Sequence, residues 1–351
     1  MGDPLRTDAV AAVDPTGQLA HILDLPAHVR DALWRVESAR LQPADAPGGL
    51  VVAGMGGSSI GGALARAAIG DRASRPISLA RSYQLPSWAM TDAMILCASY
   101  SGDTEETLGC YEAARALGAP RVVVTTGGAL AQAAREDGVP VIPLPAGLQP
   151  RAAVGYMTVA ALEVAAQCNV GPNLRSEVDV AASHAEGYAA EWGPDAPEDS
   201  LAKTLARALA GTVPVIVGAG PTIPVAYRWK TQLNENAKTP AFTHELPELD
   251  HNEIVGWLGA DRLGPFSAVF LDDEDDLHPR LRSRIPLTRD LVAETAQATF
   301  VVGARGESRT ERVLSLVLLG DLVSLYVAVL GGVDPAPVPG IDRLKAELAG
   351  A

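Results

Sequence analysis

Short apolar runs alternate with longer amphipathic stretches along the first half of the chain. The runs GLVVAG, AMILCAS, PRVVVTT and VPVIPLP predict strands, and the stretches GGSSIGGALARAAIG, DTEETLGCYEAARALG and AQAAREDG predict the helices between them. Strands that alternate with helices are typical of a parallel sheet with helices on both faces. Ahead of them, Leu23, Val29, Leu33 and Val36 recur at near-helical spacing and predict an N-terminal helical segment.

The same order of strand, glycine turn and helix returns about one domain length later. It begins in TVPVIVGAGPTIPVAYRWKTQLNENA, and FSAVFLDDEDD and ATFVVGARGE add apolar strands that each end in a polar loop. A pattern repeated at this distance indicates a duplicated α/β unit. The length of 351 residues also suggests about two domains. We expect a helical segment at 1–46 and a first domain, which binds phosphate, at 47–185. A second domain is expected at 200–332 and a C-terminal helix carrying Lys345 at 333–351.

One apolar segment, Val313–Val333, imitates a membrane span. Asp321 lies near its middle, where a charged residue costs about 2.5–3.5 kcal/mol on an insertion scale. We therefore expect this segment to be a helix buried in a core or a subunit interface, and no membrane partner. The first residues of the chain contain no apolar core of signal-peptide length, which predicts a cytoplasmic protein.

Composition narrows the class of protein further. Hydrophobic residues make up 48% and charged residues 20%, as in a globular protein. Lys and Arg number 28 and Asp and Glu number 42, so the net charge is −14 and a nucleic-acid partner is disfavoured. The cysteines, Cys97, Cys110 and Cys168, form no zinc pattern and fit a reducing compartment.

Two turns rich in glycine and hydroxyl groups follow predicted strands. The first is Gly54–Gly62, GMGGSSIGG, which lacks both the later ribose carboxylate of a dinucleotide site and the lysine of a P-loop. The second, SYSGDTEET, carries Ser99, Ser101 and Thr104 where a strand passes into a helix. Glycines that merely permit a turn and residues that merely cap a helix explain either turn alone. Two such turns at neighbouring strand ends favour a phosphate site, because ligands gather at that edge of a parallel sheet.

Acid–base chemistry is suggested by polar clusters in the second half. Glu235 lies in NENAK, and His251 follows in PAFTHELPELDHNEIVGW. A carboxylate and an imidazole in one local segment suit proton transfer, although a salt bridge from Glu235 to Lys238 and a structural role for His251 are open alternatives. Arg151 follows a strand and a proline, where it can stabilise negative charge, and Lys345 lies near the C-terminus.

Together these motifs resemble those of the bifunctional phosphoglucose/phosphomannose isomerases. The matching segments are GMGGSSIGG, SYSGDTEETL, PRAAVGY, NENAKTPAF with ELDHNEIVGW, and the terminal D-P-x-P-V…I-x-x-L-K. They run in order from about Val51 to Leu348. The resemblance implies an α/β protein of two sugar isomerase (SIS) domains, each a three-layer α/β/α unit with a mostly parallel five-stranded sheet. It also implies a reaction that uses no metal and no other cofactor.

The resemblance assigns roles to individual residues. Substrate phosphate is expected on Gly57, Ser58, Ser99, Ser101 and Thr104. Glu235 matches the glutamate that moves a proton between the first two sugar carbons, and Arg151 matches the arginine that stabilises the enediolate. His251 and Lys345 match the pair implicated in ring opening. Because the histidine of the family comes from the neighbouring subunit, a homodimer with active sites completed across the interface is expected.

The chain departs from the family pattern at two positions in these turns. Asp103 stands where the family often has asparagine, and its charge is expected either to repel a phosphate dianion or to cap the helix that follows the turn. Ser59 stands where alanine is frequent.

The expected function is metal-independent interconversion of glucose 6-phosphate and mannose 6-phosphate with fructose 6-phosphate through an enediolate. The alternative is a non-catalytic SIS protein that binds sugar phosphates, which would keep the serine turns and lose the catalytic set. A nucleotide-linked oxidoreductase is disfavoured by the missing ribose carboxylate. A zinc-dependent mannose isomerase is disfavoured by the scatter of the histidines.

Overall fold

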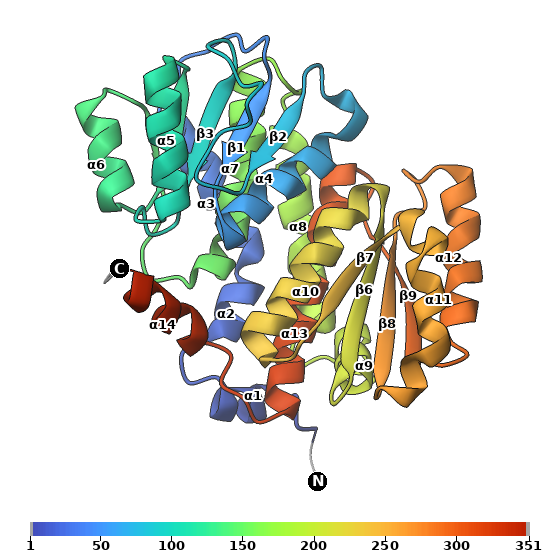
Figure 1. Cartoon of the computed structure of the whole chain (residues 1–351). Helices are drawn as coiled ribbons and strands as arrows, with labels where there is room; N and C mark the ends of the chain where they lie inside the picture. Colours follow the sequence, from blue (N-terminus) through green and yellow to red (C-terminus); the bar gives the residue numbers. More distant parts are fainter. Residues whose placement is uncertain (1–2, 349–351) are drawn as a thin grey trace. The chain divides into compact units, whose positions relative to one another are not determined.

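The computed structural model describes residues 3–348 (Figure 1). The chain divides into two compact units, each assembled from segments distant in sequence. The first-sheet unit comprises Leu23–Gly187 and Ala304–Leu316, and the second-sheet unit comprises the described residues of Met1–Ile22, Tyr188–Gly303 and Val317–Ala351. The outermost residues of the expected ranges 1–46 and 333–351 lie outside the described part of the chain.

The first-sheet unit contains a parallel five-stranded sheet in the order β2-β1-β3-β4-β5. The strands are β1 (Leu50–Ala53), β2 (Ile77–Ala80), β3 (Met94–Ala98), β4 (Arg121–Thr125) and β5 (Val141–Pro143). Four of them coincide with the predicted apolar runs. The fifth, β2, was not predicted; it is an edge strand whose central residues are only half-buried.

Helices cover both faces of this sheet. Alternate residues of β1, β3 and β4, such as Val51, Cys97 and Val123, point into a core with α5 and α6, while Val52 faces α4. The helices of this part of the chain are α3 (Leu25–Ser38), α4 (Gly56–Ile69), α5 (Glu105–Leu117), α6 (Gly128–Glu136), α7 (Val154–Gln167) and α8 (Arg175–Trp192), with short 3-10 turns η1 (Gly70–Arg72) and η2 (Pro150–Ala153). The three-layer arrangement is therefore the one expected.

The second-sheet unit contains a parallel four-stranded sheet in the order β7-β6-β8-β9. The strands are β6 (Val213–Ala219), β7 (Phe242–Leu246), β8 (Phe266–Asp272) and β9 (Ala298–Gly303). This order repeats β2-β1-β3-β4 of the first sheet, which is the topology expected of a duplicated unit. The described residues form one strand fewer here than the five expected, since they provide no counterpart of β5.

Helices also flank the second sheet. An apolar core forms between the sheet, α12 and η5, and α10 contacts β6 and β7. The helical elements of this part of the chain are η3 (Gly220–Thr222), α10 (Ile223–Ala237), η4 (Glu248–His251), α11 (Glu253–Gly256), η5 (Trp257–Arg262), α12 (Pro279–Val292) and α13 (Arg309–Leu330). The remaining helices are α1 (Thr7–Val13), α2 (Gln18–Leu23), α9 (Leu201–Leu209) and α14 (Pro339–Leu348).

The apolar segment that imitates a membrane span is the helix α13. Within residues 3–348 it alone is long and apolar enough to cross a membrane, with a mean hydropathy of 2.4 over its most apolar window. Of that window, 94% is buried in the protein. This burial is what the sequence analysis expected of a core helix.

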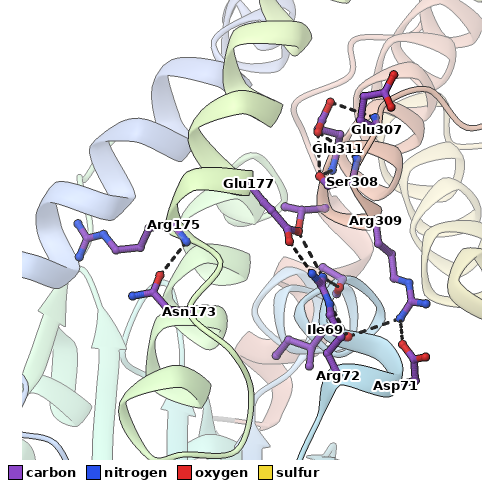
Figure 2. A network of polar contacts seen from close by, with 12 residues as sticks. Ile69, Asp71, Arg72, Asn173, Arg175, Glu177, Glu307, Ser308, Arg309 and Glu311 are labelled. Atoms are coloured by element: carbon purple, nitrogen blue, oxygen red, sulfur yellow. Dashed lines mark hydrogen bonds and ion pairs between the residues drawn. The ribbon is translucent and has the colours of Figure 1, made fainter.

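A polar network holds the start of α13 in the first-sheet unit (Figure 2). Arg309 donates to Asp71 at 3.0 Å, and Thr310 donates to Glu177 of α8 at 2.8 Å. Ser308 and Glu311 form a reciprocal cap: the Ser308 hydroxyl accepts from the Glu311 amide, and the Glu311 carboxylate accepts from the Ser308 amide. The helix thus begins with a reciprocal cap, and Arg309 is paired with Asp71.

Candidate active site

The two hydroxyl-rich turns of the first-sheet unit begin at the same level of the sheet. Ala53 at the end of β1 is in register with Cys97 of β3, so the following residues leave the same carboxyl edge. Gly54 allows the backbone after β1 to lie close to the end of β3, because a Cβ at position 54 would lie 2.7 Å from the carbonyl oxygen of Ala98. Ser58 then occupies the first turn of α4, where amides and the helix dipole favour an anion.

The hydroxyls of the second turn are bonded to one another. The Ser99 and Thr104 hydroxyl oxygens are 2.8 Å apart, and Ser99 also accepts from the Gly102 amide at 3.0 Å. Ser101 accepts from the Asp103 amide at 3.2 Å and is exposed. Thr104 is the N-cap residue of α5 by position, yet its side chain accepts no bond from the helix amides. The turn therefore presents organised donors rather than a simple helix cap.

Asp103 caps a helix, but not the one that follows it. Its carboxylate accepts from the Ala129 amide at 2.8 Å, in the first turn of α6. The N-cap position of α5 belongs to Thr104, so the expected capping of the following helix by Asp103 was wrong, and α6 is the helix that it caps. The interaction also links the hydroxyl turn to the start of α6.

Arg151 is brought against the first turn of α4. It lies in η2, just before α7, and is 4% exposed. A Cβ at Gly57 would lie 2.8 Å from the Pro150 carbonyl oxygen and 3.2 Å from the Cα of Arg151. Only glycine permits this approach, so Gly57, Ser58 and the arginine segment are neighbours in the first-sheet unit.

The sequence analysis missed a cation beside this group. Arg81 follows β2, the neighbour of β1, and its Nε donates to the Ser59 hydroxyl at 2.6 Å. Ser59 is 1% exposed within α4. The position of Arg81 depends on β2, a strand that the apolar runs of the sequence did not predict. Its only signal in the sequence is the unusual Ser59.

Glu235 lies near the end of α10 in the second-sheet unit, and α13 anchors that helix. Arg228 and Asp321 form a buried pair, with Nε to Oδ1 at 2.9 Å and Nη2 to Oδ2 at 2.5 Å. One residue beyond Glu235, the side-chain Nδ2 of Asn236 donates to the Ser324 hydroxyl at 2.9 Å. The polar residues of the apolar helix α13 therefore fix the helix that carries the carboxylate.

Lys238 closes the C-terminal end of α10. Its Nζ donates to the carbonyl oxygens of Glu235, Asn236, Asp334 and Pro335, at 2.9, 3.3, 2.8 and 2.9 Å. The lysine thereby satisfies helix-end carbonyls and attaches the segment that precedes α14. These contacts give Lys238 a structural role at the end of α10.

His251 and Lys345 are both exposed in the second-sheet unit. His251 ends η4, and the preceding Asp250 is held by Arg284 at 2.6 Å and Thr288 at 2.7 Å. Lys345 lies in α14, none of whose described residues is buried. The backbone that presents His251 is thus fixed to α12, while Lys345 projects from a helix on the surface.

The three cysteines of the chain are buried thiols. Cys97, Cys110 and Cys168 are free and buried, and burial raises the pKa of Cys110 and of Cys168 to about 11. Burial also raises the pKa of Cys97, so these thiols stay protonated at neutral pH. Within residues 3–348, no group of three or more His, Cys, Asp or Glu side chains is placed to hold a metal ion.

Comparison with known proteins identifies relatives along most of the chain. The family described as "Bacterial phospho-glucose isomerase C-terminal SIS domain" matches residues 198–348. A bifunctional phosphoglucose/phosphomannose isomerase of Caldicellulosiruptor bescii is 40% identical over 303 residues, covering 86% of this chain and 89% of the relative. The protein of the same name from Aquifex aeolicus is 34% identical, covering 86% and 90%.

A solved structure shares the fold. The crystal structure of a glucose-6-phosphate isomerase like protein from Thermus thermophilus superposes with a TM-score of 0.65 at 20% identity, covering 98% of this chain and 99% of that one. This likeness supports the α/β architecture of parallel sheets described above.

Proposed function

The chain belongs to the bifunctional phosphoglucose/phosphomannose isomerase family, and we propose that it interconverts glucose 6-phosphate and mannose 6-phosphate with fructose 6-phosphate. The observation that carries the proposal is the identity of 40% to a relative of that name across 86% of the chain. The retained glutamate, arginine, histidine and lysine argue for an enzyme rather than a non-catalytic sugar-phosphate-binding protein.

Glu235 is the proposed base. Its carboxylate removes the proton from C2 of the open-chain aldose, the electron pair forms the enediolate, and the protonated carboxyl returns the proton to C1. The hydroxyl protons rearrange between O1 and O2, so no atom or electron is gained or lost. The bonds from Arg228 to Asp321 and from Asn236 to Ser324 support this role, because a base that serves two carbons needs a fixed helix.

The first-sheet unit supplies the proposed phosphate and enediolate contacts. Gly57, Ser58, Ser99, Ser101 and Thr104 bind the phosphate through amides and hydroxyls, and Arg151 stabilises the negative charge of the enediolate. The bonded pair of Ser99 and Thr104 supports this assignment, since their mutual orientation is set before substrate arrives.

His251 and Lys345 are proposed to open the sugar ring, with His251 supplied by a second copy of the chain in a homodimer. A cytoplasmic location and the domain boundaries 47–185 and 200–332 belong to the same proposal, as does a place in glycolysis and gluconeogenesis. Mixing Glu235→Gln subunits with His251→Ala subunits tests the assembly. Exchanged subunits should recover activity, because one site of each heterodimer carries neither change. Light scattering that shows a monomer at assay concentration would reject the dimer.

The activity itself is tested by one coupled assay. Purified protein is given glucose 6-phosphate or mannose 6-phosphate, and fructose 6-phosphate formation is followed with and without EDTA. Turnover of both sugars that is unchanged by EDTA is the expected result. Binding of the sugar phosphates without turnover would select the non-catalytic alternative instead.

A further inference from the structure

Tyr100 lies between two proposed phosphate-binding serines, and its hydroxyl serves a different segment. The side chain is 9% exposed. Its hydroxyl donates to the Pro145 carbonyl oxygen at 2.9 Å and accepts from the Leu148 amide at 2.8 Å. The ring therefore extends from the hydroxyl-rich turn after β3 to the loop after β5.

The backbone of Tyr100 is fixed as firmly as its side chain. Its carbonyl oxygen accepts from the Thr126 amide at 3.0 Å and from the Thr126 hydroxyl at 2.8 Å. Both ends of the tyrosine are thus bonded, one to the loop after β4 and the other to the loop after β5. A residue held at both ends in this way can fix the loop after β5 relative to the carboxyl edge of the sheet.

That segment leads directly to Arg151. Gly147 lies in sequence between Pro145 and Leu148, the two residues bonded by the Tyr100 hydroxyl. Its φ is +94°, which glycine adopts without strain. Downstream, the Ala152 amide donates to the Gln149 carbonyl at 2.8 Å, and Arg151 is buried in η2. The hydroxyl of Tyr100 fixes the loop at Leu148, just before η2 begins.

We propose that Tyr100 is the positioning residue of Arg151: its hydroxyl sets the loop from which the enediolate-stabilising arginine departs. The inference rests on the proposed function, because it takes the role of Arg151 from there. Tyr100 itself is not assigned a contact with substrate. Burial raises the pKa of Tyr100, and the bond from the Leu148 amide opposes this effect only in part. Because the pKa is raised, the hydroxyl keeps its proton at neutral pH and can donate it to a hydrogen bond.

The substitution Tyr100→Phe removes both hydroxyl bonds and retains the ring. Since Ser99, Ser101 and Thr104 keep their side chains, KM for fructose 6-phosphate should stay within about twofold, while kcat falls about tenfold, the loss expected for displaced transition-state charge stabilisation. Tyr111→Phe is the matched control, because Tyr111 is fully buried in α5 of the same unit and its hydroxyl donates to Asp137 at 2.8 Å. It should leave both kcat and KM unchanged.

A double-mutant cycle separates positioning from a general structural effect. In an Arg151→Lys background, Tyr100→Phe should lower kcat by less than about twofold, because the group on which it acts is already altered. Equal losses of kcat in both backgrounds would overturn the proposal, as would a Tyr100→Phe variant with unchanged kcat. A rise in KM alone would also overturn it, by assigning the tyrosine to the phosphate turn.

Hydrogen exchange provides a readout that does not need activity. Peptides covering residues 145–153 should exchange faster in Tyr100→Phe than in the wild-type protein or in Tyr111→Phe. Absence of isomerase activity in the wild-type protein would reject the proposed function rather than the link itself. Identical exchange in that segment would overturn the link, whatever the activity.

Discussion

The carboxyl edges of the two sheets share a topology and differ in chemistry. In the first sheet, β1 and β3 lead into turns rich in glycine and hydroxyl residues, and the Ser99 and Thr104 hydroxyls of the second turn are bonded to each other. In the second sheet, the corresponding strands are β6 and β8, and β8 ends in the acidic run Asp272–Asp276. Burial, followed by the neighbouring Glu274, raises the pKa of Asp272, as expected where carboxylates crowd together.

The only hydroxyl in the turn after β6 is used within the fold. Thr222 donates to the carbonyl oxygens of Ala219 and Leu271 and accepts from the Ala219 amide, so it ties β6 to β8. An edge with this arrangement and a neighbouring acidic run repels phosphate. The comparison teaches that one framework can keep its strand order while a single edge carries the hydroxyl groups proposed to bind phosphate. The second sheet contributes instead the helix α10, which carries Glu235.

Among the substitutions that test this division of roles, Glu235→Gln should have the largest effect on kcat. The amide keeps the shape of the side chain but cannot accept a proton, so kcat should fall by about 10²–10⁴-fold, the usual contribution of a general base. Calorimetry should still detect fructose 6-phosphate binding, because the residues proposed to bind the phosphate belong to the first-sheet unit and are unchanged. Near-normal turnover would remove Glu235 from the mechanism.

Changes at the phosphate turn should affect substrate binding. Ser101→Ala combined with Thr104→Val removes two hydroxyl donors, each worth roughly 1.5–3 kcal/mol to an anion, and KM should rise by at least about tenfold. Glu274→Gln, in the acidic run of the second sheet, is the matched control and should change KM by less than about twofold. If both variants behaved alike, the contrast between the two edges would have no functional meaning.

The cap at the start of α13 should affect stability rather than activity. Glu311→Ala removes the reciprocal bonds with Ser308 and should lower the free energy of unfolding by about 1 kcal/mol at pH 7. Burial raises the pKa of Glu311, but the bonds from Ser308 and His184 outweigh it and hold that pKa below its ordinary value.

The sign of the pH dependence follows from this lowered pKa. The carboxylate contributes stability above its unfolded-state pKa, and the contribution is lost as the pH falls through the folded-state value. Urea unfolding at several pH values should therefore show the difference between the wild-type protein and Glu311→Ala shrinking below about pH 4. A difference that grew on acidification would contradict the assignment.

Asp103→Asn should have the smallest effect. The Oδ1 of asparagine can still accept from the Ala129 amide, and the negative charge beside the hydroxyl turn is removed. KM should remain within about twofold of the wild-type value or decrease slightly, because capping by asparagine is about as good as capping by aspartate. A marked rise in KM would mean that the charge itself orders the turn.

The sequence predicted the central strands and the edge strands β5 and β9, and it missed the strand at the other edge of each sheet. Both β2 and β7 are edge strands, and residues such as Ser78, Thr243 and Glu245 interrupt their apolar pattern. An edge strand can leave part of its length to solvent, so it needs no continuous apolar run. Central strands buried on both faces, such as β1 and β3, do need one.

The candidate site divides in a similar way. Serines, glycines and Glu235 could be selected from the sequence because the residue types and their spacing carry the chemistry. The partners of Asp103, Tyr100 and Arg81 could not, because these contacts join residues that are distant in sequence and meet only once the sheet has formed. Local pattern was therefore enough to nominate candidate reacting groups, and tertiary structure was needed to find the residues that contact them.

Deuterium exchange tests the central claim, proton transfer by Glu235 through an enediolate, most directly. Glucose 6-phosphate is incubated with the wild-type protein in D₂O and the recovered sugar is examined by NMR. The account predicts deuterium at C2 of the recovered glucose 6-phosphate, and no incorporation with Glu235→Gln. Complete retention of the C2 hydrogen over many turnovers, together with an active Glu235→Gln variant, would contradict it.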